Sequence, residues 1–201
     1  MKVLVGCEFS GKVRDAFAHK GHEAWSCDYL PAEGKHQHKH IQSNVLDLLN
    51  QNWDLLICFP PCTFLSSSGL HWNGRVEGRQ AKTDAALQFV RTLLTADIPM
   101  IALENPVGCI STKIKKPDQI IQPYDFGDNA SKRTCLWLKN LPNLTPTEYF
   151  PPRISNGKER WGNQTDSGQN KLAPSPTRAK KRSITYDGIA NAMADQWGQN
   201  I

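Results

Sequence analysis

Short apolar runs alternate with amphipathic stretches along the first half of the chain. The apolar runs predict four buried strands, at Val3–Val5, Glu23–Cys27, Leu55–Cys58 and Pro99–Leu103. Apolar residues at helical spacing predict one helix that ends near Gly21 and a long helix within residues 77–97. Strands that alternate with helices are typical of an α/β fold with a mainly parallel sheet and flanking helices.

The pattern changes in the second half of the chain. Residues 141–178 are rich in Pro, Asn, Gly, Ser and Thr, which predicts a small irregular segment. Residues 179–201 contain a helical stretch in which Ile189, Met193 and Trp197 share one face. We therefore expect an α/β domain over residues 1–140, a small recognition segment, and a C-terminal helix that packs back on the domain.

Composition narrows the class of protein without identifying it. The chain has 201 residues, of which 39% are hydrophobic, and no apolar run approaches the ~20 residues that a membrane span requires. No secretory signal follows Met1, so we expect a cytoplasmic protein, with its six cysteines as free thiols.

The net charge is +5, and Lys180, Lys181 and Arg182 belong to a basic C-terminal stretch. Such a stretch suits a phosphate backbone, although a solvated polar tail would show the same pattern.

Polar residues follow each predicted strand directly. They are Glu8–Gly11 after the first strand, Asp28 after the second, Pro60–Cys62 after the third and Glu104–Asn105 after the fourth. Ligands of open parallel sheets bind at the carboxyl ends of the strands. The four strand ends therefore predict one binding site at a shared edge.

Cys62 and Glu104 are the two residues there that carry reactive groups. A cysteine in a loop stiffened by two prolines can act as a nucleophile, and a carboxylate held by Pro106 can act as an acid. The alternatives are a buried structural thiol and a helix-capping or surface acid. Neither motif decides between these interpretations by itself.

Taken together, the motifs resemble the DNA cytosine-5 methyltransferases. Pro60-Pro61-Cys62, Glu104-Asn105-Pro106 and the Phe9-Ser10-Gly11 turn occur in the order found in that family, in a compact form similar to phage or prophage members. Ser131-Lys132-Arg133-Thr134 resembles the arginine-bearing strand of the family. The resemblance implies a Rossmann-like, S-adenosylmethionine-dependent methyltransferase fold.

The resemblance also implies roles for single residues. Cys62 would add to C6 of a flipped-out cytosine while Glu104 acts at N3, which lets C5 accept a methyl group from S-adenosylmethionine. Asn105 would hold the loop and Arg133 would bond the cytosine O2. The cofactor would lie against Glu8, Phe9, Ser10, Gly11, Asp28, Asp47 and Pro60.

The implied partner is double-stranded DNA, inside a bacterial or phage-infected cell, in a protective, regulatory or restriction-modification setting. DNA contacts are expected from Ser66, Arg75, Arg79, Lys180, Lys181 and Arg182, with Trp72 beside the flipped base. No metal is expected, because the alternating histidines at His36, His38 and His40 have no cysteine or acid at ligand spacing.

Other functions stay open from the sequence. One is a non-catalytic DNA-binding relative that keeps the fold. Others are a cytosine modifier that acts on RNA or a free nucleotide, for which a small recognition segment suffices, and an enzyme that transfers a modified group from a related sulfonium cofactor.

Overall fold

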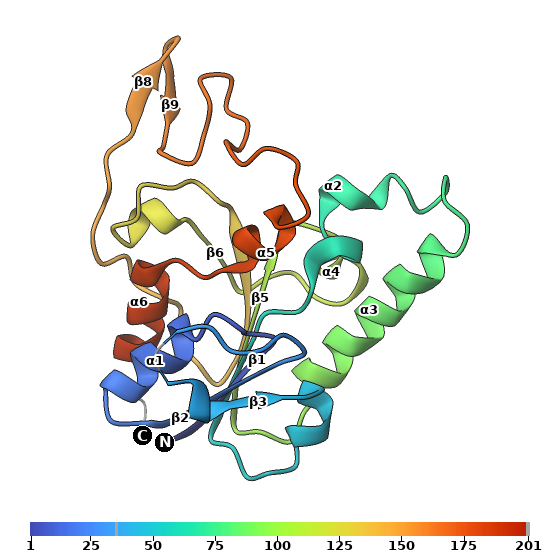
Figure 1. The fold of residues 1–201 in the computed structure, drawn as a ribbon, viewed down its shortest axis with the longest axis vertical. Helices are drawn as coiled ribbons and strands as arrows, with labels where there is room; N and C mark the ends of the chain where they lie inside the picture. Colours follow the sequence, from blue (N-terminus) through green and yellow to red (C-terminus); the bar gives the residue numbers. More distant parts are fainter. Residues whose placement is uncertain (35, 200–201) are drawn as a thin grey trace.

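The computed structural model describes residues 1–34 and 36–199 and is built on one seven-stranded sheet. The strand order is β3-β2-β1-β4-β5-β7-β6, with helices on both faces (Figure 1). The order of the parallel strands reverses between β1 and β4. In α/β sheets of this kind, ligands bind outside the carboxyl ends of the two strands at such a reversal.

Five strands run parallel and two complete the sheet beyond them. The parallel strands are β1 (Lys2–Gly6), β2 (Glu23–Asp28), β3 (His40–Gln42), β4 (Leu55–Cys58) and β5 (Met100–Pro106). The strand β7 (Thr134–Lys139) runs antiparallel to both β5 and β6 (Gln119–Ile121). The central strands are buried on both faces, which explains why their sequences are continuous apolar runs.

Two hydrophobic cores lie on opposite faces of the sheet. On one face, α1 (Lys12–His19) and α6 (Asp187–Trp197) bury Phe17, Met193 and Trp197 against the strands. On the other face, α3 (Arg79–Leu94) and α4 (Ile110–Lys113) pack over Trp137 and its neighbours. The short helices are η1 (Gln37–Lys39), η2 (Val45–Leu48), η3 (Cys62–Phe64), α2 (Ser67–Leu70), η4 (Pro123–Asp125) and α5 (Arg178–Ser183).

The irregular segment contains one regular element, the hairpin β8 (Arg153–Ser155) and β9 (Lys158–Arg160). Asn156 and Gly157 form its two-residue turn with positive φ angles of 51° and 69°. An Asn-Gly pair favours this turn, and it was the sequence signal that could have predicted the hairpin. The hairpin stands away from the sheet (Figure 1). The segment is anchored where Trp161 stacks on Tyr124, with ring centres 4.1 Å apart.

The predicted Rossmann-like α/β fold, with a mainly parallel sheet and flanking helices, is confirmed, and so are the four strands and the long helix predicted in the first half. One boundary was wrong. Glu104, Asn105 and Pro106 were expected in a loop, but they belong to β5 and pair with the first residues of β7. The three-part division of the chain stays a prediction. In residues 1–34 and 36–199, no helix has the length and apolar character needed to cross a membrane.

Candidate active site

The carboxyl edge of the sheet collects chain segments that are far apart in the sequence. The parallel strands β1, β2, β4 and β5 end there, whereas the antiparallel strand β7 begins there. The loop after β4 therefore lies beside the end of β5 and the entry to β7. This arrangement brings Cys62, Glu104 and Lys132 into one neighbourhood.

Asn105 connects β5 to the loop that follows β4 and carries Cys62, which we call the cysteine-bearing loop. Its side-chain amide donates a 2.7 Å hydrogen bond to the carbonyl oxygen of Pro60, and the residue is only 1% exposed. Its Oδ1 atom has no hydrogen-bond partner among the residues that the structure describes. The hydrogen bond from the buried Asn105 amide to the loop holds the segment that carries Cys62 close to the end of β5.

The rest of the loop is held from behind. The backbone N–H of Cys109 donates to the carbonyl oxygen of Leu65 at 2.8 Å, and the hydroxyl of Ser67 donates to the carbonyl oxygen of Val107 at 2.6 Å. Ser66, a predicted DNA contact, forms a bridge with Gly108, and its hydroxyl lies 3.2 Å from that of Ser68. These bonds join the loop to the segment that follows β5.

Arg79 was predicted to contact DNA, but the structure places its guanidinium against the protein. The group donates to the carbonyl oxygens of Thr63 at 3.2 Å and Gly69 at 3.3 Å. It also lies over the ring of Phe64, 5.0 Å from the ring centre. Arg79 therefore supports the turn that begins at Cys62, a role that a basic residue on a loop does not reveal in the sequence.

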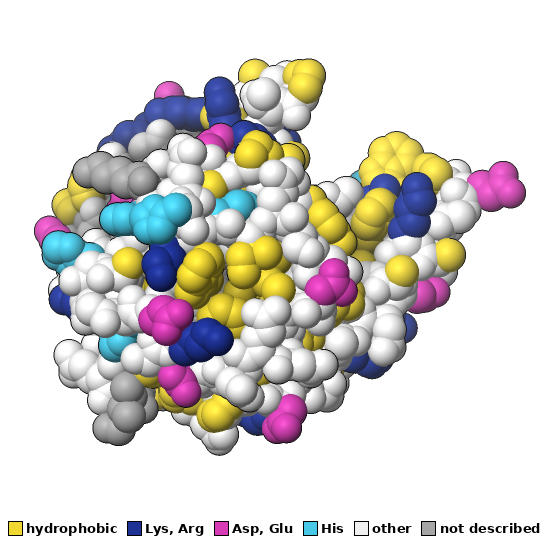
Figure 2. All heavy atoms as spheres, turned by 60° about the horizontal axis from the view of Figure 1, so that its bottom comes forward, with side chains coloured by type: hydrophobic (Ala, Val, Ile, Leu, Met, Phe, Trp, Pro, Cys, Tyr) yellow, Lys and Arg dark blue, Asp and Glu magenta, His cyan; other side chains and the backbone are white. Residues whose placement is uncertain are grey.

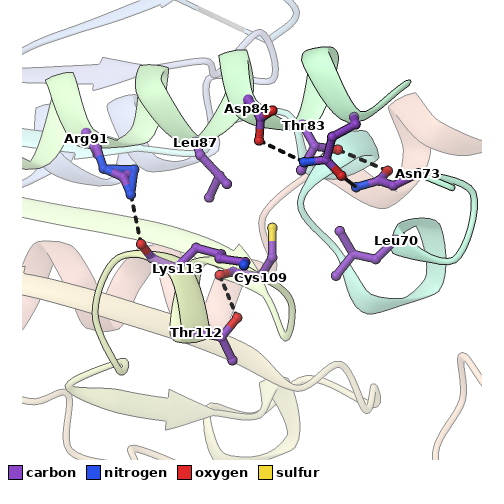
Figure 3. A pocket seen from close by; sticks show the side chains of 10 residues that line it. Leu70, Asn73, Thr83, Asp84, Leu87, Arg91, Cys109, Thr112 and Lys113 are labelled. Atoms are coloured by element: carbon purple, nitrogen blue, oxygen red, sulfur yellow. Dashed lines mark hydrogen bonds between the residues drawn. The ribbon is translucent and has the colours of Figure 1, made fainter. Parts of the chain in front are cut away.

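A pocket of about 520 Å³ lies between α3, α4 and the end of α2 (Figure 3). Along one wall, Thr83, Asn73, Gln80 and Asp84 form a chain of side-chain hydrogen bonds. Among the described residues, none of those predicted for catalysis or cofactor binding lines this pocket. The hydrogen-bond chain attaches the α2–α3 connection to α3 and so supports the cysteine-bearing loop from one more side.

The α2–α3 connection forms an arm that stands out from the body of the protein. Hydrophobic and basic side chains gather on it (Figure 2). Its exposed residues include Trp72, Arg75 and Val76, with exposed fractions of 45% for Trp72 and 48% for Val76. The arm follows the cysteine-bearing loop directly in the sequence.

Three charged groups surround the thiol of Cys62, which is the exposed cysteine of the chain. Partial burial raises the pKa of this thiol above its ordinary value, and the carboxylate of Glu104 raises it further. Lys132 and Arg182 act in the opposite direction and lower the pKa. The thiol is therefore mostly protonated at neutral pH, and its reactivity depends on the balance of these neighbours.

Lys132, which the sequence did not single out, reaches the site where Arg133 was expected. Its ammonium nitrogen lies 3.9 Å from Oε1 of Glu104. Burial raises the pKa of Cys135 and of Tyr124, and the charge of the exposed neighbour Arg133 opposes this rise in both groups. Both residues precede β7, so the course of the segment that leads into this strand decides which of the two faces Glu104, and the sequence does not reveal that course.

The turn after β1 uses its polar groups within the protein. Glu8 is 4% exposed, and its carboxylate accepts backbone N–H groups from Val13 at 2.7 Å and Arg14 at 3.3 Å. Burial raises the pKa of Glu8 to about 7, against the effect of these hydrogen bonds and of the Arg14 charge. Glu8 therefore caps α1, and this role accounts for the acid without a cofactor.

The neighbouring residues of the turn are also explained by local packing. Gly11 has φ 73°, and a Cβ there would lie 2.1 Å from Nη2 of Arg14, so the turn needs glycine for both reasons. The hydroxyl of Ser10 lies 3.4 Å from the Glu8 carboxylate. Phe9 is buried under the ammonium group of Lys180, which lies 4.9 Å from the ring centre.

The acids at the ends of the next elements are more open. Asp28 ends β2, and one of its carboxylate oxygens accepts the N–H of Leu30 at 2.9 Å. Asp47 is exposed on η2. Carboxylate oxygens accept hydrogen bonds from ribose hydroxyls and from an exocyclic amine. The chemistry of Asp28 and Asp47 therefore fits a nucleoside cofactor.

Two of the three basic residues predicted to bind DNA in α5 also have contacts within the protein, and their role in DNA binding stays a prediction. The ammonium group of Lys180 lies 2.6 Å from the carboxylate of Glu33. The carbonyl oxygen of Arg182 accepts a hydrogen bond from Lys132 at 3.3 Å, and its charge acts on Cys62. Lys181 is exposed. Within the described ranges, no cluster of histidine, cysteine and acid residues has the arrangement of a metal site.

Comparisons with known proteins add little to this picture. No protein-family model matches the chain, and no curated protein matches it. One similar solved structure is an Escherichia coli protein proposed to be a DNA modification methyltransferase encoded within a prophage, with 14% sequence identity and a TM-score of 0.45. The match covers 75% of this chain and 52% of that one, so the chain spans about half the length of this neighbour.

Proposed function

We propose that the protein is a DNA methyltransferase that transfers a methyl group from S-adenosylmethionine to C5 of a flipped-out cytosine. One observation carries the proposal. The thiol of Cys62 and the carboxylate of Glu104 lie at one sheet edge, close enough for the Glu104 charge to raise the pKa of the thiol. Asn105 fixes the loop that joins them. The proposal depends on this site and not on the likeness to the E. coli structure.

The two groups match the two needs of the reaction. The sulfur of Cys62, after losing its proton, forms a bond to C6, while Glu104 supplies or shares a proton at N3. The electron pair of the former C5–C6 double bond would then be available at C5 to form a bond to the methyl carbon, while the bond between that carbon and the sulfonium sulfur of the donor breaks and its electron pair stays on the sulfur. Loss of the C5 proton to a base and departure of the Cys62 sulfur from C6 restore the aromatic ring.

S-Adenosylmethionine supplies a methyl group bound to a positively charged sulfur. In this chain, Asp28 and Asp47 would hold the ribose and adenine, and the Pro60 end of the loop would border the methyl group. The turn at Glu8–Gly11 would shape the floor of the cofactor site from the capped start of α1. Glu8 and Gly11 would thus act through the backbone that they organise.

Double-stranded DNA is the proposed substrate, and its cytosine has to leave the stack because a paired base is out of reach of a thiol. The projecting arm follows the cysteine-bearing loop in the sequence, and its exposed Trp72 and Arg75 would contact the duplex. The exposed Lys181 is the member of the basic helix that is free to meet phosphates.

The proposal is tested with an oligonucleotide duplex that carries 5-fluorocytosine, incubated with S-adenosylmethionine. Fluorine cannot leave as a cation, so the covalent complex accumulates and is counted by denaturing electrophoresis and mass spectrometry. We expect an adduct with the wild type, none with Cys62→Ala, and an adduct with Cys135→Ala, which removes a buried thiol at the same edge.

Two results would overturn the proposal. One is methylation of cytosine C5 by Cys62→Ala at the wild-type rate. The other is transfer of the labelled methyl group to another atom of DNA, or to RNA or deoxycytidine monophosphate in place of DNA.

A further inference from the structure

We propose that Lys132 is a positioning residue for the Cys62–Glu104 pair and that α5 holds Lys132 in place. Helix α5 would thereby connect the cofactor turn, Glu8–Gly11, to the catalytic cluster of Cys62, Glu104 and Lys132. The significance of this inference rests on the proposed function, but its first test needs neither DNA nor cofactor. Lys132 occupies the entry to β7, which meets the end of β5 at the carboxyl edge of the sheet.

The ammonium group of Lys132 connects two elements. It lies 3.9 Å from Oε1 of Glu104 and donates a 3.3 Å hydrogen bond to the carbonyl oxygen of Arg182. The side chains of Lys132 and Glu104 are 24% and 12% exposed. A partly buried charge pair is screened less by water than a surface pair, so the ammonium group acts strongly on its surroundings.

The backbone that presents Lys132 is fixed on both sides. Its N–H donates to the side chain of Gln122 at 2.9 Å, and its carbonyl oxygen accepts the Thr134 hydroxyl at 3.1 Å. The preceding Ser131 is held by two 2.9 Å hydrogen bonds to the side chain of Asn163. A side chain on such a supported backbone has few alternative positions, which suits a residue that positions others.

Helix α5 also contacts the cofactor turn, through Lys180, which precedes Arg182 by two residues. Lys180 binds the carboxylate of Glu33 at 2.6 Å and lies over the ring of Phe9. Glu33 in turn donates its N–H to the carbonyl oxygen of Phe9 at 2.8 Å. Within one turn of helix, α5 therefore contacts the turn after β1 through Lys180 and the neighbourhood of Cys62 and Glu104 through Arg182.

The consequence concerns the reactivity of Cys62. The charged groups that face the thiol are Glu104 from β5, Lys132 from the entry to β7 and Arg182 from α5. The two cations stabilise the thiolate, and both depend on the docking of α5. Loss of the Lys132 ammonium group leaves the Glu104 carboxylate with less compensation and so makes the thiolate harder to form.

The test measures alkylation of Cys62 by iodoacetamide as a function of pH, with the modified peptide counted by mass spectrometry. We expect Lys132→Met to move the midpoint of the profile to higher pH by about one unit. Lys132→Arg keeps the charge and should restore much of the wild-type profile. Lys116→Met removes the same charge from an exposed site elsewhere and should leave the profile unchanged.

Two further variants separate the parts of the proposal. Glu33→Gln loosens the far end of α5, so we expect a shift in the same direction as Lys132→Met but smaller. Arg133→Met should leave the profile near that of the wild type. An unshifted profile for Lys132→Met, or an equal shift for Arg133→Met, overturns the role of Lys132, whereas an unshifted profile for Glu33→Gln overturns the role of α5.

A second measurement links the proposal to turnover. With saturating DNA and cofactor, Lys132→Met should lower the rate of adduct formation on 5-fluorocytosine DNA by about 10-fold while DNA affinity stays near the wild-type value. A rate equal to that of the wild type would contradict the role of Lys132. If the wild type forms no adduct at all, the proposed function fails, and the alkylation profiles still decide the role of Lys132.

Discussion

The two halves of the carboxyl edge differ in how they use their polar groups. At the β1–β2 end, the carboxylate of Glu8 caps α1, and Arg14 occupies the space beside Gly11. At the β4–β5 end, the thiol of Cys62 is exposed, and the amide of Asn105 holds only the loop. Motif residues in the first half build the local structure, whereas those in the second half leave reactive atoms available.

This difference teaches how a motif should be interpreted. The residues of the first turn resemble those of the family named in the sequence analysis, yet the contacts of Glu8 and Gly11 are explained by the start of a helix. The second half has no comparable structural explanation for an exposed cysteine beside a carboxylate. Its polar groups therefore carry more of the functional argument, and the two halves predict different responses to mutation.

The largest expected effect is that of Asn105→Ala. Without the bond to Pro60, the cysteine-bearing loop is free to move by about 1 Å, a displacement that costs on the order of 10²-fold in rate. Single-turnover adduct formation on 5-fluorocytosine DNA measures this loss. Asn140→Ala is the matched control, because Asn140 makes a similar 2.8 Å bond to the carbonyl oxygen of Pro99. A rate for Asn105→Ala as high as that of the control would refute the positioning role.

Glu8→Gln should change stability in a pH-dependent way. Burial raises the pKa of Glu8 from its ordinary value of 4.5 to about 7, so the folded state binds this proton more tightly than the unfolded state. Its stabilising contribution is therefore present below pH 4.5 and lost as the pH rises through 7. Relative to Glu8→Gln, the wild type should lose about 2 kcal/mol of unfolding free energy between pH 5 and pH 8.

Urea denaturation at the two pH values measures this difference. The control is Glu23→Gln, which replaces an exposed glutamate at the start of β2 and should follow the wild type at both pH values. Parallel pH dependence in the wild type and Glu8→Gln would show that Glu8 is not buried as a capping acid.

The smallest expected effects separate Arg79 from Arg75. Arg79 supports the turn at Cys62, so Arg79→Met should lower the rate of adduct formation by about 10-fold with DNA affinity nearly unchanged. Arg75 is exposed on the arm, so Arg75→Met should weaken DNA binding and reduce the slope of log affinity against log salt by about one. Fluorescence anisotropy at several salt concentrations, together with adduct kinetics, distinguishes the two. Equal changes of adduct rate and of DNA affinity in Arg79→Met and Arg75→Met would contradict the separate roles of the two arginines.

Much of the fold follows from local sequence patterns. The buried strands are apolar runs that end at polar residues, and α3 has apolar residues at helical spacing, so both could be predicted from the sequence. The extension of β5 through Pro106 could not, because its partner β7 lies almost thirty residues further along the chain. A strand boundary of this kind depends on tertiary pairing that a local pattern does not contain.

The candidate site was predictable to a smaller degree. Cys62 and Glu104 stand out because their residue types are unusual directly after apolar strands. The directions of Lys132 and Arg133 depend on how the chain enters β7, and the contact of Lys180 with Glu33 depends on where α5 lies. A run of basic residues in the sequence indicates charge but not its direction, so Lys132 and the internal role of α5 required the structure.

The reversed direction of β7 has a consequence for how this site could change over time. At the carboxyl edge of the sheet, each parallel strand contributes the residues that follow its last position. The antiparallel β7 contributes the residues that precede its first position. The side chain beside Glu104 is therefore chosen by the connection that leads into β7 from η4. An insertion or deletion in residues 126–131 could exchange that neighbour while the parallel strands, and the loop that carries the thiol, keep their places.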